Sequence, residues 1–161
     1  MKSIGKQLDN NWESRAKSNI VIIDDVPANL RLLTGILARP DYMIRPIPDP
    51  LMALSAIKSE PPDIILLDIM MPTMSGYDVC ACLKSDFETK DIPVIFITAK
   101  DNIQDKIKGF SLGAVDYITK PFQADEVVAR VEMHLKMYAL QKSLHKQKEE
   151  MSALNRQLEI E

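Results

Sequence analysis

The stretch PPDIILLDIMMPTMSGYDV, Pro61 to Val79, decides the fold because it places a single acid at the end of an apolar run. The run from Ile64 to Leu67 is apolar at every position, which is typical of a strand buried on both faces of a sheet. Asp68 follows at once, and Ile-Met-Met-Pro comes next instead of a turn rich in Gly and Ser. A buried strand that ends in a carboxylate predicts a polar site at one edge of a sheet.

The chain on both sides of this stretch alternates short apolar runs with helical periods. Strands are predicted for five runs: NIVIIDD (19–25), YMIRPIPD (42–49), DIILLD (63–68), IPVIFITA (92–99) and VDYITKPF (115–122). Pro46 and Pro48 cannot donate ladder hydrogen bonds, so the second run is expected at the edge of the sheet. Five strands alternating with helices predict an α/β fold, a doubly wound parallel sheet covered on both faces.

The composition is that of an ordinary soluble domain with some chain to spare. The chain has 161 residues, 46% hydrophobic and 27% charged, with a formal net charge of −3. No basic cluster indicates nucleic-acid binding, and no apolar run reaches the roughly 18 residues of a membrane span. The polar N-terminus has no signal-peptide core. We therefore expect a cytoplasmic protein with neither a nucleic-acid nor a membrane partner.

The last part of the chain predicts one continuous helix, because residues 124–161 contain no proline and no glycine. Its beginning, with Val127, Val131 and Leu135, has the spacing of a helix that packs on the sheet. Further on, a heptad repeat appears, with Met137, Leu144, Met151 and Leu158 at its a positions and Leu140, Gln147 and Leu154 at its d positions. We expect a parallel coiled-coil homodimer, although an isolated helix of this kind can also be frayed and monomeric.

These features divide the chain into three parts. Residues 1–18, which include Trp12, form an N-terminal extension without a motif. Residues 19–135 form the globular domain, and residues 136–161 form the coiled-coil helix. Cys80 and Cys82 lie two apart on a predicted helix, so their side chains point to different faces and neither a disulfide nor a shared metal is expected.

Polar residues that can carry chemistry lie at the carboxyl ends of the predicted strands. They are Asp24 and Asp25 after the first strand, Asp68 after the third, Thr98 after the fourth and Lys120 after the fifth. In such sheets ligands bind at that edge. Carboxylates held close together repel unless a cation neutralises them, and Mg²⁺ with oxygen ligands is the expected one. Such a site can support phosphoryl transfer to a carboxylate, with a lysine and a hydroxyl stabilising the charge.

The motifs VIIDD, DIILLDIMMPTMSGYD, PVIFITA and GAVDYITKPF resemble, in order and spacing, the receiver domains of two-component response regulators. The resemblance covers roughly residues 20–135 and implies a flavodoxin-like sheet of strand order 2-1-3-4-5. It implies that Asp68 accepts a phosphoryl group from a sensor histidine kinase or a phosphotransfer protein. It also implies that the bond between Lys120 and Pro121 is cis.

The resemblance assigns the remaining roles at the site. Asp24, Asp25 and Asp68 would hold Mg²⁺, together with the backbone carbonyl of Met70. Thr98 and Lys120 would bind the phosphoryl group. Tyr117 would be the aromatic switch residue that changes rotamer when Thr98 moves. The long helix would then carry the signal to a dimer or to an output domain such as a cyclic-dinucleotide cyclase, and the chain is then expected to be a fragment of a longer protein.

Two other functions are compatible with part of the pattern. A receiver-shaped dimerisation scaffold that is never phosphorylated would need none of the five polar residues. A phosphatase that uses an aspartyl-phosphate would need an acid two residues after Asp68, where the chain has Met70. His134 and His145 lie on the long helix, but His145 falls at a heptad b position and lacks the acidic neighbour of a kinase phosphoacceptor histidine. We therefore expect no relay histidine.

Overall fold

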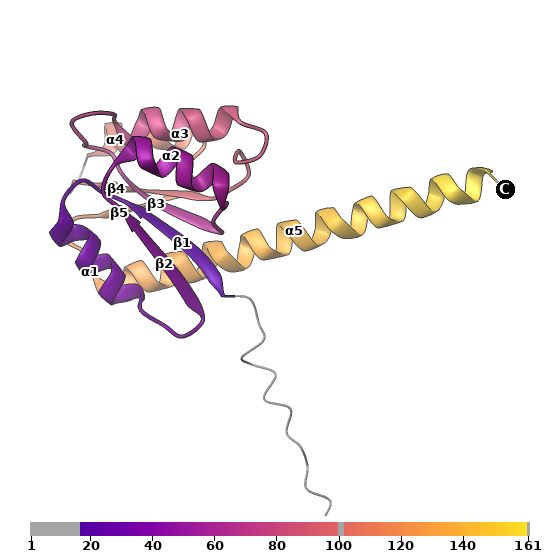
Figure 1. Cartoon of the computed structure of the whole chain (residues 1–161), viewed down its shortest axis with the longest axis horizontal. Helices are drawn as coiled ribbons and strands as arrows, with labels where there is room; N and C mark the ends of the chain where they lie inside the picture. The colour runs from indigo at the N-terminus through magenta and orange to yellow at the C-terminus, as the bar shows by residue number, and fades with distance from the viewer. Residues whose placement is uncertain (1–16, 100–101, 161) are drawn as a thin grey trace, which may run out of the picture.

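The computed structural model describes residues 17–99 and 102–160, and Figure 1 shows their arrangement. The strands are β1 (Ser18–Ile23), β2 (Tyr42–Ile47), β3 (Ile64–Asp68), β4 (Val94–Thr98) and β5 (Asp116–Thr119). The helices are α1 (Pro27–Leu37), α2 (Pro50–Ser59), α3 (Gly76–Ser85), α4 (Ile103–Ser111) and α5 (Ala124–Ile160). The predicted alternation of strands and helices is confirmed.

The five strands form one parallel sheet in the order β2-β1-β3-β4-β5. This is the predicted doubly wound, flavodoxin-like order, with β2 at one edge. Pro46 lies within β2 opposite Ile22 of β1. An edge strand has one side without a partner strand, and a residue that cannot donate a ladder hydrogen bond is tolerated there.

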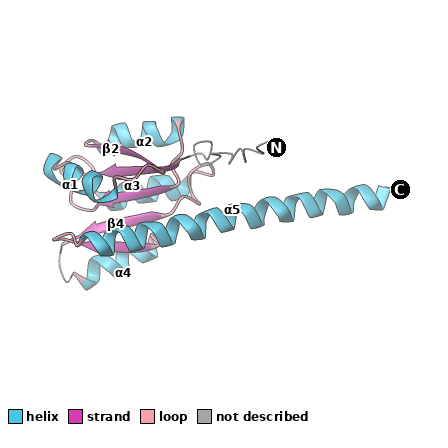
Figure 2. Ribbon diagram, turned by 90° about the horizontal axis from the view of Figure 1, so that it is seen from below, coloured by secondary structure: helices cyan, strands magenta, loops and turns pink. Residues whose placement is uncertain are grey.

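Helices cover both faces of the sheet, as Figures 1 and 2 show. On one face α1 and the beginning of α5 pack together over side chains such as Ile22, Leu66 and Ile97. On the other face α2 and α3 pack over the alternate side chains, such as Val21, Leu67 and Phe96. All residues of β3 and β4 are buried, because each of these strands has a neighbour on both sides and helices on both faces.

Local signals start and stop the helices near the site. The side chain of Ser75 accepts a hydrogen bond from the backbone N–H of Asp78 and caps α3. Asn102 caps α4 in the same way through the N–H of Asp105. Beyond α4, Gly113 has φ +101°, a conformation that favours glycine, so the chain turns there into β5. These caps fix where the loops at the carboxyl edge of the sheet begin.

Helix α5 is continuous over 37 residues. At 1.5 Å per residue its length is about 55 Å, and Figure 1 shows that it runs past the amino ends of the strands and away from the sheet. Val127, Val131 and Leu135 in its first part are buried, as predicted. The extended helix is confirmed, whereas the coiled coil stays a prediction. No helix in the described part of the chain is long and apolar enough to span a membrane.

The two thiols are free, with Cys80 buried and Cys82 exposed, as expected from their spacing. The peptide bond between Lys120 and Pro121 is cis, as the resemblance implied. Most of the predicted N-terminal extension, including Trp12, lies outside the described residues.

Candidate functional site

Three carboxylates meet at the carboxyl edge of the sheet. Asp24 and Asp25 follow β1, and Asp68 is the last residue of the neighbouring strand β3. One oxygen from each of the three lies within 4.8 Å of the others. Asp24 and Asp68 are buried and Asp25 is half-buried. The three acids proposed from the sequence therefore form one cluster, which is accessible mainly through Asp25.

Asp24 is held in place by the start of α1. One of its oxygens accepts a hydrogen bond from the backbone N–H of Val26 at 2.9 Å. The other accepts from the side-chain amide of Asn29 at 3.1 Å. Asn29 was not singled out in the sequence. Its position on the first turn of the helix that follows an acidic pair is the signal that could have found it, because side chains there point back toward the strand ends.

Lys120 approaches the cluster from β5. Its ammonium nitrogen lies 3.4 Å from Oδ1 of Asp68, and the Asp68 side chain is almost fully buried. Burial raises the pKa of Asp68 to about 6, with a further rise from the charge of Asp24 and a partial reduction from Lys120. Asp68 is thus mostly ionised at pH 7 and carries a charge that the lysine only partly neutralises.

The loop after β3 approaches the site very closely at Gly76. The N–H of Gly76 donates to the carbonyl oxygen of Ile69 at 2.9 Å. A Cβ at Gly76 would overlap the backbone carbonyl of Asp68, so this position requires glycine. Of the two methionines in the loop, Met71 is buried while Met70 is 78% exposed. The loop is therefore anchored by Met71 and Gly76 and leaves the Met70 side chain free at its surface.

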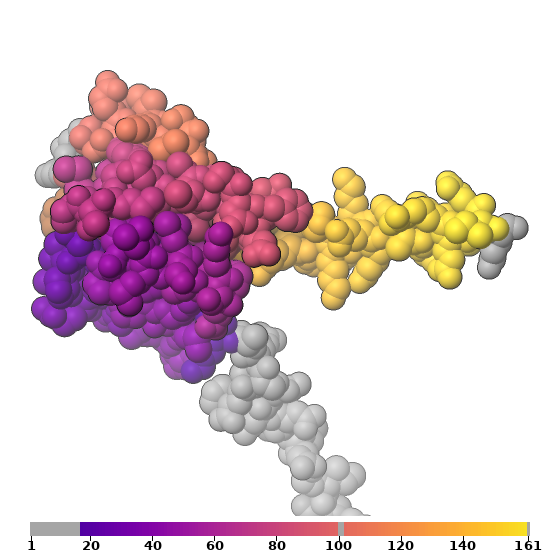
Figure 3. Space-filling model, turned by 45° about the horizontal axis from the view of Figure 1, so that its top comes forward, coloured from indigo at the N-terminus to yellow at the C-terminus, as the bar shows by residue number. Residues whose placement is uncertain are grey.

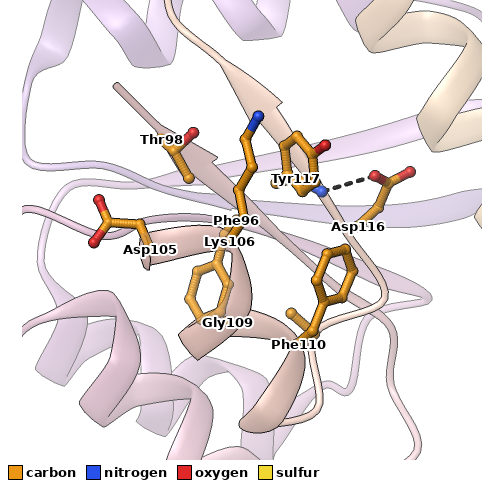
Figure 4. A pocket seen from close by; sticks show the side chains of 9 residues that line it. Phe96, Thr98, Asp105, Lys106, Gly109, Phe110, Asp116 and Tyr117 are labelled. Atoms are coloured by element: carbon orange, nitrogen blue, oxygen red, sulfur yellow. Dashed lines mark hydrogen bonds between the residues drawn. The ribbon is translucent and has the colours of Figure 1, made fainter. Parts of the chain in front are cut away.

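Thr98 and Tyr117 line the same narrow pocket on the α4 side of the sheet, shown in Figure 4. The Thr98 hydroxyl is buried and has no hydrogen-bond partner among the described residues. The Tyr117 ring packs edge-on against Phe110 at 5.7 Å between ring centroids. The Lys106 ammonium lies 4.2 Å from the centre of the Tyr117 ring. The hydroxyl is thus available to a ligand, and the ring is held by α4.

The donor set fits a hard divalent cation. All the side-chain ligands it offers are carboxylate oxygens, which are the ligands that Mg²⁺ prefers. Oδ1 of Asp25 is buried without a hydrogen-bond partner among the residues described, and an ionised oxygen in that situation needs a cation. The geometry of the carboxylates therefore suits a cation held between Asp25 and Asp68.

A second buried polar group lies at the start of β5, and the sequence analysis missed it. The carboxylate of Asp116 pairs with Arg130 at 2.7 Å and with Nε2 of His134 at 3.0 Å. Burial alone would raise the pKa of Asp116, but the hydrogen bonds from His134 and Arg130 outweigh it and hold the pKa below its usual value. Arg130 and His134 lie four apart on α5, so their shared helical face is the signal that could have indicated a common partner. The network ties β5 to α5.

The fold and the site together define a class of protein, in which a doubly wound parallel sheet carries a cluster of three acids and a lysine at its carboxyl edge. The family model described as the response regulator receiver domain matches residues 20–132. The chain therefore belongs to the response regulator receiver family, as the motifs implied. The matched region includes the acid cluster, Thr98, Lys120 and the first turns of α5.

Several relatives share this domain and differ in the rest of their chains. The DNA-binding dual master transcriptional regulator RpaA of Synechocystis is 43% identical over 117 residues, covering 73% of this chain and 48% of that protein. A probable cyclic di-GMP phosphodiesterase of Vibrio cholerae is 42% identical over 123 residues, covering 76% of this chain and 28% of that protein. The chain thus spans about half or less of the length of these relatives.

Solved structures show the same fold. The receiver domain of the Francisella response regulator 1452 superposes with a TM-score of 0.69 at 28% identity, covering 75% of this chain and 98% of that structure. A quarter of this chain therefore lies outside that match, although nearly the whole of the other chain is aligned.

Proposed function

We propose that this chain is a phosphorylation-dependent switch in which Asp68 accepts a phosphoryl group from a sensor histidine kinase or a phosphotransfer protein. The observation that carries the proposal is the position of the buried Asp68 carboxylate, between the acids of β1 and the Lys120 ammonium. Membership of the receiver family supports it. The receiver domain itself is regulatory, and any enzymatic activity would belong to a separate output domain.

In this proposal an oxygen of the ionised Asp68 attacks the phosphorus of the donor. A bond between Asp68 and phosphorus forms as the phosphorus–nitrogen bond of the donor phosphohistidine breaks. The donor ring, already protonated on its other nitrogen, keeps the electron pair of that bond and leaves as neutral imidazole. Lys120 neutralises negative charge that builds up on the phosphoryl oxygens. The free hydroxyl of Thr98 donates a hydrogen bond to one of these oxygens once the group is attached. Both residues stabilise the product without changing their own protonation.

Asp24, Asp25 and Asp68, together with the carbonyl of Met70, would hold Mg²⁺. The ion would supply charge neutralisation between the carboxylates and the incoming phosphoryl oxygens. Asp24, which is fixed by Val26 and Asn29, is suited to orient a bound water rather than to move toward a ligand. Asp25 is the least buried of the three acids, and its Oδ1 has no hydrogen-bond partner within residues 17–99 and 102–160, so we assign it the direct contact.

The output side of the proposal rests on α5. We divide the chain into an extension (1–18), a receiver domain (19–135) and a signalling helix (136–161) that pairs in parallel with that of a second chain. The heptad side chains Met137, Leu144 and Met151 support this pairing because they are 50 to 66% exposed although apolar. Movement of Thr98 and Tyr117 would change the face made by α4, β5 and α5, which leads into this helix.

The proposal is tested by intact-mass spectrometry after incubation with acetyl phosphate, with and without Mg²⁺. We expect the wild-type chain to gain one phosphoryl group only with Mg²⁺, and Asp68→Asn to gain none. Asp41→Asn, a change of the same kind on the surface, is the matched control and should react like the wild type. If the wild-type chain gains nothing from either acetyl phosphate or a kinase, it is a scaffold. Mg²⁺ binding that Asp25→Asn does not weaken would contradict the assigned metal site.

A further inference from the structure

Beyond the sheet, α5 makes a contact with the receiver domain that neither the heptad pattern nor the phosphoryl site requires. The ammonium of Lys142 lies 3.2 Å from Oδ1 of Asp63, a residue 79 positions earlier in the chain. Asp63 immediately precedes β3, at the amino end of the sheet and opposite the acid cluster. The signalling helix is therefore joined to the end of the strand whose other end carries Asp68.

Asp63 is itself fixed in position. Its second oxygen, Oδ2, accepts a hydrogen bond from the backbone N–H of Asn19 at 2.7 Å. Its own backbone N–H donates to the carbonyl oxygen of Asn19 at 2.8 Å. Asn19 lies in β1 and Asp63 immediately precedes the neighbouring strand β3, so the carboxylate that meets Lys142 is fixed to the edge of the sheet where these two strands begin. A carboxylate fixed in this way loses little further freedom when it forms an ion pair.

Tyr138 is half-buried on the side of the helix that faces this edge of the domain. The Lys142 ammonium lies 4.5 Å from the centre of the Tyr138 ring. Burial raises the pKa of the Tyr138 phenol, and the charges of Asp63 and Asp91 add to the rise. Tyr138, Lys142 and Asp91 also line one groove between α5 and the domain. Tyr138 and Lys142, one turn apart on α5, thus face the same groove.

These contacts lie on the face of α5 that already packs on the sheet. The buried residues of that face are Val127, Val131, His134 and Leu135. At 3.6 residues per turn, Tyr138 and Lys142 continue the same face beyond the sheet. The exposed apolar side chains Met133, Met137, Leu140 and Leu144 follow the nearly opposite face. The contact therefore directs the heptad face away from the receiver domain.

We propose that Asp63, Tyr138 and Lys142 form a brace that fixes the direction and the rotation of the signalling helix, so that its apolar face meets that of a second chain. The brace itself lies within one chain. Only its consequence, the meeting of two apolar helix faces, rests on the proposed dimer. It assigns a positioning role to Asp63, at the end of β3 opposite the phosphoacceptor. Loss of the brace would let the part of α5 beyond Leu135 bend away from the domain, so that its heptad face would no longer keep one direction.

The test is the distance between two spin labels in the full chain, one on the natural exposed thiol of Cys82 and one on Ser152→Cys. Labelled chain is mixed with excess unlabelled chain, so that only distances within one chain are observed. We expect a single narrow distribution of label-to-label distances when Asp63, Tyr138 and Lys142 are unchanged. Lys142→Glu places two negative charges together, and we expect about a two- to fivefold larger population away from the wild-type distance, as the strength of a surface ion pair implies.

Two further variants make the result specific. Asp63→Asn combined with Lys142→Glu removes the repulsion and keeps an oxygen for Asn19, so it should return most of the distribution to the wild-type distance. Lys148→Glu makes the same change of charge away from Asp63 and should leave the distribution unchanged. A wild-type distribution in Lys142→Glu would overturn the proposal. So would a double variant as displaced as the single one, since Asp63 would then not be the partner.

The same samples separate this inference from the proposed function. Sedimentation reports whether the chain dimerises, and acetyl phosphate labelling reports whether Asp68 is modified. A monomeric or unmodified chain with a narrow, Lys142-dependent distance would contradict the proposed function and leave the brace intact. A phosphorylated dimer whose intrachain distance does not change in Lys142→Glu would support the proposed function and contradict the brace.

Discussion

The Lys120 ammonium lies 3.4 Å from the buried carboxylate of Asp68, close enough to attract it but not to neutralise its repulsion from Asp24. Burial, and after it the charge of Asp24, raises the pKa of Asp68 to about 6 from 3.8, and Lys120 offsets this rise only in part. The ionised Asp68 carboxylate therefore opposes folding at neutral pH, and a cation bound at this edge of the sheet would relieve the unfavourable charge.

Neutralising Asp68 should stabilise the chain when divalent cations are absent. At pH 7.5 the ionised carboxylate costs folding free energy because its folded pKa lies above its unfolded one, and Asp68→Asn should raise the free energy of unfolding by about 1–3 kcal/mol. As the pH falls through 6 toward 3.8 the folded wild type takes up the proton and recovers this stability. The difference between the two proteins should therefore shrink at pH 5.

Urea denaturation in the presence of a chelator measures this effect. Adding Mg²⁺ should stabilise the wild type at pH 7.5 and have a much smaller effect on Asp68→Asn. An Asp68→Asn variant less stable than the wild type at pH 7.5 would show that the carboxylate is not under electrostatic strain.

Gly76→Ala should destabilise the fold because the added methyl group overlaps the Asp68 carbonyl, which cannot move away from the sheet. We expect a loss of about 2–4 kcal/mol in the free energy of unfolding, measured by urea denaturation. Gly35→Ala on α1 is the matched control, since nothing lies within 4 Å of its added Cβ. That change should stabilise by up to about 1 kcal/mol. Equal effects at the two positions would contradict the close approach at Gly76.

Thr98→Ala should uncouple Tyr117 from the site at little cost in stability. The Thr98 hydroxyl has no hydrogen-bond partner among described residues, so its loss should change the free energy of unfolding by less than about 1 kcal/mol. Beryllium fluoride with Mg²⁺, a phosphoryl analogue, should shift the NMR signals of the Tyr117 ring in the wild type and hardly at all in Thr98→Ala. Thr34→Ala should behave like the wild type. An equal shift in Thr98→Ala would show that Thr98 does not couple Tyr117 to the site.

Met70→Asn should shorten the lifetime of the phosphorylated state. The exposed Met70 side chain follows Asp68 by two residues and is expected to limit the access of water. A polar side chain there should speed hydrolysis by up to about tenfold, equivalent to 1.4 kcal/mol in the barrier. Phosphoryl loss followed by intact mass measures it, with Thr73→Asn in the same loop as control. An unchanged rate in Met70→Asn would refute the idea.

Leu144→Glu should weaken the proposed dimer, because it places a charge at a heptad a position where both chains bury an apolar side chain. We expect at least about a tenfold rise in the dissociation constant by sedimentation equilibrium. Ser152→Glu, at an outward b position of the same helix, is the control. The coiled coil is falsified if both variants associate as the wild type does.

The strands of this protein and the meeting of its three acids were predictable because their signals are local. A buried parallel strand is apolar at every position, so Ile64 to Leu67 and the acid after them could be recognised from the sequence. Parallel strands end at one edge, which is why Asp24, Asp25 and Asp68 were expected together and are found so. The prolines of the second run, which cannot donate ladder hydrogen bonds, predicted that β2 lies at the edge of the sheet.

What only the tertiary structure decided are the contacts between polar side chains far apart in the sequence. Asp116 meets Arg130 and His134, and Asp63 meets Lys142, although nothing in the periodicity of either segment names its partner. Periodicity determines which residues share a face of a helix. Which loop that face meets depends on where the helix leaves the sheet, and this is set by the packing of Val127, Val131 and Leu135. The sequence by itself determined the elements and which residues lie at the strand ends, whereas the contacts of α5 with the rest of the domain determined the direction in which its heptad face points.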